Sequence, residues 1–113
     1  MPLSELSEKD RRIIFQCLSA VLKGKFLEDD YEARIGIDED DIDKIVAAFP
    51  EIDDSNDDSD VTLAINNSLN EVCHGIRFSD DEWNQWFDVN KSEVEEVYWK
   101  WAKLRGWSQT GIR

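Results

Sequence analysis

The chain has 113 residues, of which 41% are hydrophobic and 35% are charged, and its formal net charge is −13 at pH 7. This length supports one domain with a single hydrophobic core, because about two-thirds of the unfolded surface can be buried on folding. No stretch approaches the ~20 apolar residues of a membrane span, and the excess of acids argues against direct nucleic-acid binding.

The N-terminal third of the chain predicts one long helix and one short helix. Apolar residues recur at helical spacing over residues 7–23, and Gly24 is placed to end this helix in a left-handed conformation. A short helix is expected to follow over about residues 29–35 and to end at Gly36.

The best-defined helix start lies in the acidic middle of the chain. The pattern predicts a helix over residues 39–48, with Asp38 as its N-cap. Ile37 and Ile42 stand at the two positions of a hydrophobic staple, and Pro50 follows the helix end. The capping residue, the staple and the stop signal therefore agree on this helix.

Residues 51–59 are mostly acids and serines without periodicity, which predicts a loop. The next helix is expected to be capped by Asp58 or Ser59 and to run to about His74. Its inward face is expected to be apolar, with Val61, Ala64, Ile65, Leu69 and Val72. Its outward face is expected to be polar, with Asn66, Asn67, Asn70 and Glu71.

Capping-box spacing predicts the starts of the last two helices. One box, at residues 79–82, opens a short helix that carries Trp83, Trp86 and Phe87. The second box, at residues 92–95, opens a longer helix that ends at Gly106. The inward residues of that helix are expected to be Val94, Val97, Tyr98, Trp101 and Leu104.

Helical periodicity accounts for the apolar segments along the whole chain. The period-two alternation that is typical of strands is missing, and no internal repeat is present. The sequence therefore predicts an all-α fold: a compact single-domain bundle of five or six helices, two of them short, over residues 1–113.

The negative charge is concentrated in one third of the chain. Residues 28–60 contain fifteen acidic and two basic residues, so their net charge is −13, whereas residues 1–27 and 61–113 carry +2 and −2. The last fourteen residues contain four basic residues and no acid. This pattern predicts an acidic middle segment and a basic C-terminal end, with residues 106–113 as a flexible tail.

Neither catalysis nor secretion is indicated by the sequence. His74 is the single histidine and stands beside Cys73, but neighbouring helix residues point in different directions and do not form a catalytic pair. Motifs of common hydrolases, metalloproteases and phosphate-binding loops are missing. Cys17 and Cys73 fall on apolar helix faces, and no secretory signal precedes them, which predicts a reducing, cytoplasmic location.

The run from Asp53 to Asp60 is similar in composition to a calcium-binding loop. Counted from Asp54, its sixth position is Ser59 instead of glycine, and its twelfth is Ile65 instead of a bidentate glutamate. Asp, Asn and Ser also favour turns and helix caps, so a solvated capping loop is the preferred interpretation. A zinc site lacks ligands, and we expect no metal and no cofactor.

The helices predicted at 29–35 and 39–48 have the proportions of a helix-turn-helix. The second helix, however, would press Glu39, Asp40 and Asp41 towards the phosphates of DNA, so direct DNA binding is rejected. These carboxylates could instead imitate a phosphate backbone, or they could only cap and solubilise the helix. The sequence favours the second interpretation and leaves the first open.

All five tryptophans lie after residue 82, and two of them do not belong to the predicted core. Trp99 stands at the edge of its helix, and Trp107 follows that helix. Exposed tryptophans beside Lys103 and Arg105 are typical of a partner-binding hot spot. A tail that folds back and buries both rings is an equal alternative.

These observations predict a small acidic protein-interaction module without catalytic activity, which contacts a protein partner through the acidic middle, the basic C-terminal edge with its tryptophans, or both. A basic partner would suit the acidic middle. The candidate partner-binding residues are Glu39, Asp40, Asp41, Trp99, Lys103, Arg105 and Trp107. One alternative is an anion- or DNA-mimicking inhibitor of the immunity type, acting on a basic partner. A second is an enzyme with a carboxylate-based site, which requires a cavity with two acids of raised pKa. The acidic middle and basic tail also permit homo-oligomers, and no membrane partner is expected.

Overall fold

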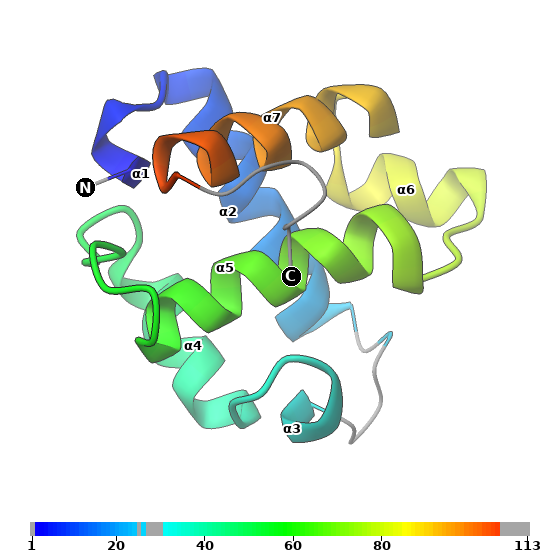
Figure 1. Cartoon of the computed structure of the whole chain (residues 1–113). Helices are drawn as coiled ribbons and strands as arrows, with labels where there is room; N and C mark the ends of the chain where they lie inside the picture. The colour runs from blue at the N-terminus through cyan, green and yellow to red at the C-terminus, as the bar shows by residue number, and fades with distance from the viewer. Residues whose placement is uncertain (1, 25, 27–30, 107–113) are drawn as a thin grey trace.

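The computed structural model describes residues 2–24, 26 and 31–106, with only the backbone described at Glu32, and all regular structure in these ranges is helical (Figure 1). In chain order the elements are α1 (Pro2–Glu5), α2 (Glu8–Lys23), α3 (Tyr31–Arg34), α4 (Glu39–Ala48), α5 (Asp60–Asn70), the π-helical segment η1 (Glu71–Gly75), α6 (Asp80–Trp86) and α7 (Lys91–Leu104). The predicted all-α single-domain architecture is confirmed.

Helix α2 is the centre of the bundle and packs against α4, α5, α6 and α7. In Figure 1 it passes behind α5 and α7, with α4 at the lower end of the molecule and α7 at the upper end. Its stripe of Ile14, Cys17, Leu18 and Val21 is fully buried. The accessible surface of 6342 Å² matches the about 6,400 Å² expected for a folded monomer of this mass.

Side-chain caps begin the helices where the sequence predicts them. The Asp38 carboxylate accepts a hydrogen bond from the Asp41 amide at 2.9 Å, and Ser59, not Asp58, caps α5 by accepting from the Thr62 amide at 3.2 Å. The capping box predicted at residues 79–82 is complete at the start of α6. Helix α4 has the predicted bounds, so local capping signals were sufficient there.

The capping box predicted at residues 92–95 is wrong. Helix α7 begins at Lys91, and its box is formed by Asn90 and Glu93. The Asn90 side chain accepts from the Glu93 amide at 3.0 Å, and the Glu93 carboxylate accepts from the Asn90 amide at 3.0 Å. Asparagine is as good an N-cap as serine, and Ser92 instead donates to the Asn90 side chain at 2.7 Å.

The end of α2 and the length of α3 differ from the prediction. Gly24 ends α2 with φ −76°, so the left-handed conformation expected there is wrong. Glycine fits this position because a Cβ atom would lie 2.2 Å from the ring of Phe26. Helix α3 spans only Tyr31–Arg34, and the predicted start at residues 29 and 30 lies outside the described residues. Gly36, with φ +94°, follows α3 in the conformation that favours glycine.

Two expected outward positions of α5 and η1 are buried. Asn66 is 2% exposed and accepts a hydrogen bond from the Tyr98 hydroxyl at 2.7 Å, and Glu71 forms an ion pair with Arg34. The polar outward face is therefore wrong at these positions, because α5 packs against α2, α4 and α7 on several sides. A buried polar group needs such a partner to offset its desolvation.

Leu104 is 43% exposed, so its predicted inward position at the end of α7 is wrong. The Arg105 side chain is buried instead, and Gly106, with φ +84°, turns the chain after it. A guanidinium therefore occupies the inner end of α7, where the periodicity predicts an apolar residue. Its partners, Asp54 and Asp57, lie in the loop at residues 51–59.

The buried carboxylate of Asp54 joins the loop at residues 51–59 to both ends of the fold. Its Oδ2 accepts hydrogen bonds from the Leu3 amide at 3.0 Å and from the Trp101 indole at 2.9 Å. The same oxygen lies 3.8 Å from the Arg105 guanidinium, which also donates to the Asp54 carbonyl and pairs with Asp57. Charge-assisted hydrogen bonds of this kind are about twice as strong as neutral ones.

We expect Asp54→Ala to lower the free energy of unfolding by about 3–5 kcal/mol, because it leaves the Leu3 amide and the Trp101 indole without their acceptor and removes one of the two carboxylates beside the buried Arg105 guanidinium. Urea unfolding followed by circular dichroism measures this loss. Asp54→Asn keeps an acceptor oxygen and should cost less. The exposed neighbour Asp58 is the control, since Asp58→Ala should change stability by no more than about 0.5 kcal/mol. Equal losses at Asp54 and Asp58 would show that the network is not important for the fold.

Candidate functional site

Several carboxylates of the acidic segment have structural roles. Asp38 caps α4, and Asp54 holds the loop to α1 and α7. Asp53 Oδ1 accepts from the amide and the hydroxyl of Ser55 at 2.9 and 2.6 Å. Asn56 Oδ1 accepts from the Asp58 amide at 2.9 Å in a second turn of this kind. The run that is similar to a calcium loop thus folds as turns and a helix cap.

Three other carboxylates, on the first two turns of α4, face solvent. We call Glu39, Asp40 and Asp43 the α4 acidic face; all three residues are exposed. They surround a shallow hollow of about 390 Å³ together with Leu22 and Lys23. Within the described part of the chain, none of these carboxylates has a hydrogen bond or an ion pair at 4.0 Å or less.

The sequence-predicted candidate Asp41 differs from its neighbours on α4. It is partly buried, and its carboxylate lies 3.9 Å from the Lys44 amine. Glu39 and Asp40 are exposed as a binding role requires. Asp43, which the sequence analysis did not single out, stands one turn after both and extends the same surface. The i, i+3 and i, i+4 spacing from the two candidates could have indicated it.

The candidates near the C-terminus have different environments. Trp99 is partly buried and Lys103 is exposed, and their i, i+4 spacing places them on one face of α7. The Arg105 side chain is only 1% exposed and is paired with Asp54 and Asp57. Trp107 and the rest of the predicted tail after Gly106 lie outside the described residues. Arg105 therefore has a structural role, while Trp99 and Lys103 border the surface.

The structure separates the two groups of candidates. Figure 1 places α4 at the lower end of the molecule and α7 at the upper end, with α2 and α5 between them. Glu39 and Asp40 therefore do not lie beside Trp99 and Lys103. The acidic segment and the C-terminal bases do meet at Asp54, Asp57 and Arg105, within a single molecule.

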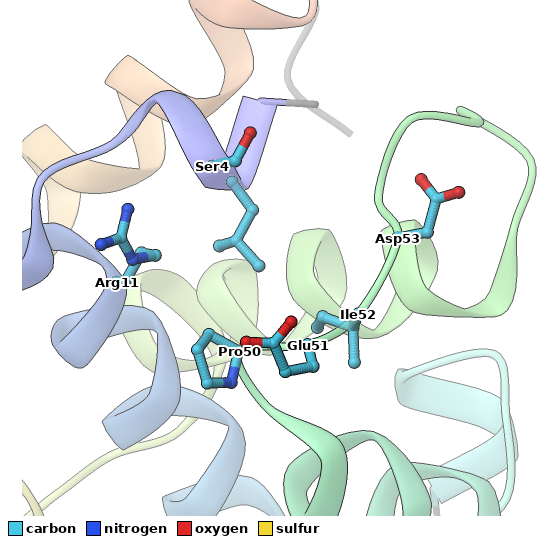
Figure 2. A pocket seen from close by; sticks show the side chains of 7 residues that line it. Ser4, Arg11, Pro50, Glu51, Ile52 and Asp53 are labelled. Atoms are coloured by element: carbon cyan, nitrogen blue, oxygen red, sulfur yellow. The ribbon is translucent and has the colours of Figure 1, made fainter.

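A hollow of about 540 Å³ lies between α1, the start of α2 and the loop after α4 (Figure 2). Its charged lining residues are Arg11, Glu51 and Asp53. Figure 2 shows Arg11 and Asp53 on opposite sides of the opening, so their charges do not converge. Hydrogen bonds from Ser55 lower the pKa of Asp53, whereas a general acid requires a raised pKa. Asp53 is therefore poorly suited to act as a general acid in this hollow.

The thiols and the histidine do not form a reactive site. Burial, with a smaller contribution from Glu95, raises the pKa of Cys73 to about 12, and burial also raises the pKa of Cys17. His74 is exposed, whereas Cys73 is 1% exposed, so the two side chains lie in different environments. In the described ranges, no three His, Cys, Asp or Glu side chains are grouped to hold a metal ion.

A second buried polar cluster was missed by the sequence analysis. Glu71, the first residue of η1, pairs with Arg34, and Asn67 donates to the Ile35 carbonyl at 2.6 Å. Gly75 allows this arrangement, because a Cβ atom there would lie 2.2 Å from the Glu71 carboxylate. The wider π-helical turn changes which residues point inward, and no periodicity signal indicates such a turn.

Comparisons of the chain with models of known protein families, with curated proteins and with solved structures give no match. Among the described residues, no helix is both long and apolar enough to cross a bilayer. The exposed carboxylates of the α4 acidic face and the hollows of the surface are therefore the features from which a function is proposed.

We expect Cys17 and Cys73 to react with a disulfide reagent more than about 100-fold slower in the native protein than in denaturant. Burial and raised pKa values suppress the reactive thiolate until the chain opens. The absorbance of the coloured thiolate that the reagent releases at about pH 8 measures the rate of thiol labelling. The variant Asn84→Cys, which places a thiol at an exposed position, is the control and should react at once. Fast labelling of either native cysteine would contradict this packing.

Proposed function

We propose that the protein is a small acidic protein-interaction module without catalytic activity, which binds a basic protein partner through the α4 acidic face. The observation that carries the proposal is the exposure of three neighbouring carboxylates that have no partner in the described structure. Most other acids of residues 28–60 for which the structure shows contacts cap a helix, stabilise a turn or join parts of the fold. Glu51, Asp58 and Asp60 are exposed without such contacts too, but in the described part of the segment the α4 acidic face is where three such carboxylates surround one hollow.

The physical setting of this face suits recognition of a basic surface. Asp38 already provides the N-cap of α4, so Glu39, Asp40 and Asp43 are not needed for capping. Their solvent exposure keeps the desolvation penalty of an ion pair small, and clustered charge of one sign accelerates association with an oppositely charged partner. Specificity would come from the hollow that the three residues share with Leu22.

Trp99 and Lys103 are proposed as a second, smaller contact on α7. Both lie on one helix face and border the surface, as a binding role requires. Arg105 is left out of this contact because its guanidinium is buried against Asp54. A homo-oligomer through opposite charges is less favoured, since Arg105 already meets acids of its own chain. The buried, unpaired thiols support the proposal of a cytoplasmic location.

The alternative function, an anion- or DNA-mimicking inhibitor of the immunity type, is favoured by one feature. Asp40 and Asp43 stand one helical turn apart on an exposed surface. The same helix face continues to Ala47 and α4 ends at Ala48, so its row of carboxylates is short. A groove-binding mimic would compete with duplex DNA for its partner, whereas a module that binds another basic surface would not.

The test removes the charge of the α4 acidic face without changing its shape. We expect the triple variant Glu39→Gln, Asp40→Asn, Asp43→Asn to lose at least about tenfold in affinity for a basic partner captured from native lysate, because three ion pairs are removed. Binding of the wild type should also weaken as salt is raised. Biolayer interferometry with the purified partner measures both effects, and adding duplex DNA tests for groove mimicry.

The matched control has the same change in net charge elsewhere on the molecule. Asp81→Asn, Glu95→Gln, Glu96→Gln alters three exposed acids on α6 and α7 and should retain wild-type affinity. Equal weakening in both triple variants would show that net charge, not the α4 acidic face, governs binding. Circular dichroism checks that both variants remain folded.

A further inference from the structure

A third hollow, of about 550 Å³, lies where η1, α6 and the start of α7 meet. We call it the basic pocket. Its apolar lining is buried or partly buried and consists of Val72, Ile76, Phe78 and Trp83. Its exposed basic lining consists of His74, Arg77 and Lys91, and the acidic residue among its lining is Asp80.

The cations of this pocket have no ion pair, in contrast to six other described bases. Six described bases lie within 4.0 Å of a carboxylate oxygen: Lys9, Arg12, Arg34, Lys44, Lys100 and Arg105. In the same described ranges, neither Arg77 nor Lys91 has an ion pair or a side-chain hydrogen bond. Arg11, Lys23 and Lys103 have no ion pair in these ranges either, but Arg77 and Lys91 are the two described bases of this kind that line one hollow together.

The position of Lys91 adds to this point. It is the first residue of α7, where a positive side chain opposes the helix dipole. The helix start is secured by the capping box of Asn90 and Glu93, so Lys91 contributes nothing to it. The positive charge of Lys91 is slightly unfavourable for the helix and lies at the edge of the hollow. A bound anion explains its presence better than the stability of the helix does.

The apolar side of the pocket is a rigid aromatic surface. Phe78 packs edge-on against Phe26, Trp83 and Phe87, with ring centroids 4.7, 5.3 and 5.9 Å apart. Trp83 stacks on Phe87 at 4.2 Å, and its indole donates to the Val89 carbonyl at 2.8 Å. These contacts hold the rings in place before any ligand binds, which lowers the entropic cost of binding.

We propose that the basic pocket binds a small organic anion with a flat apolar body, of which an aryl carboxylate is the simplest example. The ring of the ligand lies on Phe78 and Trp83, and its carboxylate faces Arg77 and Lys91. The volume lies within the range of about 300–1,000 Å³ that is typical of small-molecule sites. The two uncharged polar residues of the lining, Ser79 and Asn90, already cap helices, so the cations supply the polar recognition of an anion.

The test uses 2-naphthoate as the probe and its uncharged amide as the comparison. We expect 2-naphthoate to bind saturably and to shift the ¹H–¹⁵N signals of Ile76, Phe78 and the Trp83 indole, measured by titration of the full chain. The amide should bind at least about tenfold more weakly, because it cannot form charge-assisted contacts with the two cations.

Two variants test the cations directly. Arg77→Gln and Lys91→Gln should each weaken 2-naphthoate binding about tenfold by calorimetry, through the loss of one charge-assisted contact. Both side chains are exposed and unpaired, so the fold should tolerate the changes. Lys103→Gln, an equal change on a distant exposed surface of α7, should leave the affinity unchanged.

Three results would overturn the proposal. One is equal affinity for the acid and the amide, and another is an absence of saturable binding up to the solubility of the probe. The third is a set of shifts centred on Arg11 or Lys23 in the other hollows. Equal weakening by Lys103→Gln would also contradict it, since that would reflect net charge and not this pocket.

Discussion

The Asp54 carboxylate holds together three parts of the chain that are far apart in the sequence. Its contacts with Leu3 and Trp101, and its proximity to Arg105, fix α1 and the end of α7 against the acidic loop. A buried charge is costly unless it is paired, so this loop has one stable position. The loop between α4 and α5 is thereby held against α1 and α7, and part of its negative charge is used inside the fold.

The acidic segment therefore has two functions that its composition does not separate. A helix cap, a turn and a buried network are formed by the carboxylates of Asp38, Asp53 and Asp54. In the sequence these residues stand beside acids that face solvent. The net charge of the segment overstates the charge available to a partner. Glu39, Asp40 and Asp43 are the clearest remaining group, because the N-cap of their helix is supplied by another residue.

Local signals allowed the fold to be predicted, and long-range contacts limited the prediction. The helix at 39–48 was predicted with its bounds, because its cap, staple and stop residue all lie within a few positions. The inward position of Arg105 and the burial of Asn66 depend on partners at least 32 residues away in the sequence. Of the candidate partner-binding residues, Glu39 and Asp40 could be predicted from the sequence as exposed. The basic pocket could not, because its residues come from three elements that meet only in the folded chain.

The α4 acidic face and the basic pocket can act independently. They lie on different sides of the bundle, with α4 at the lower end in Figure 1 and α6 at the right, below the start of α7. The molecule extends 33 × 28 × 26 Å, while the screening length at physiological ionic strength is about 8 Å. Charges on one surface are therefore largely screened from the other. A protein with an overall charge of −13 can consequently keep a local site for an anion, provided that the cations there remain unpaired.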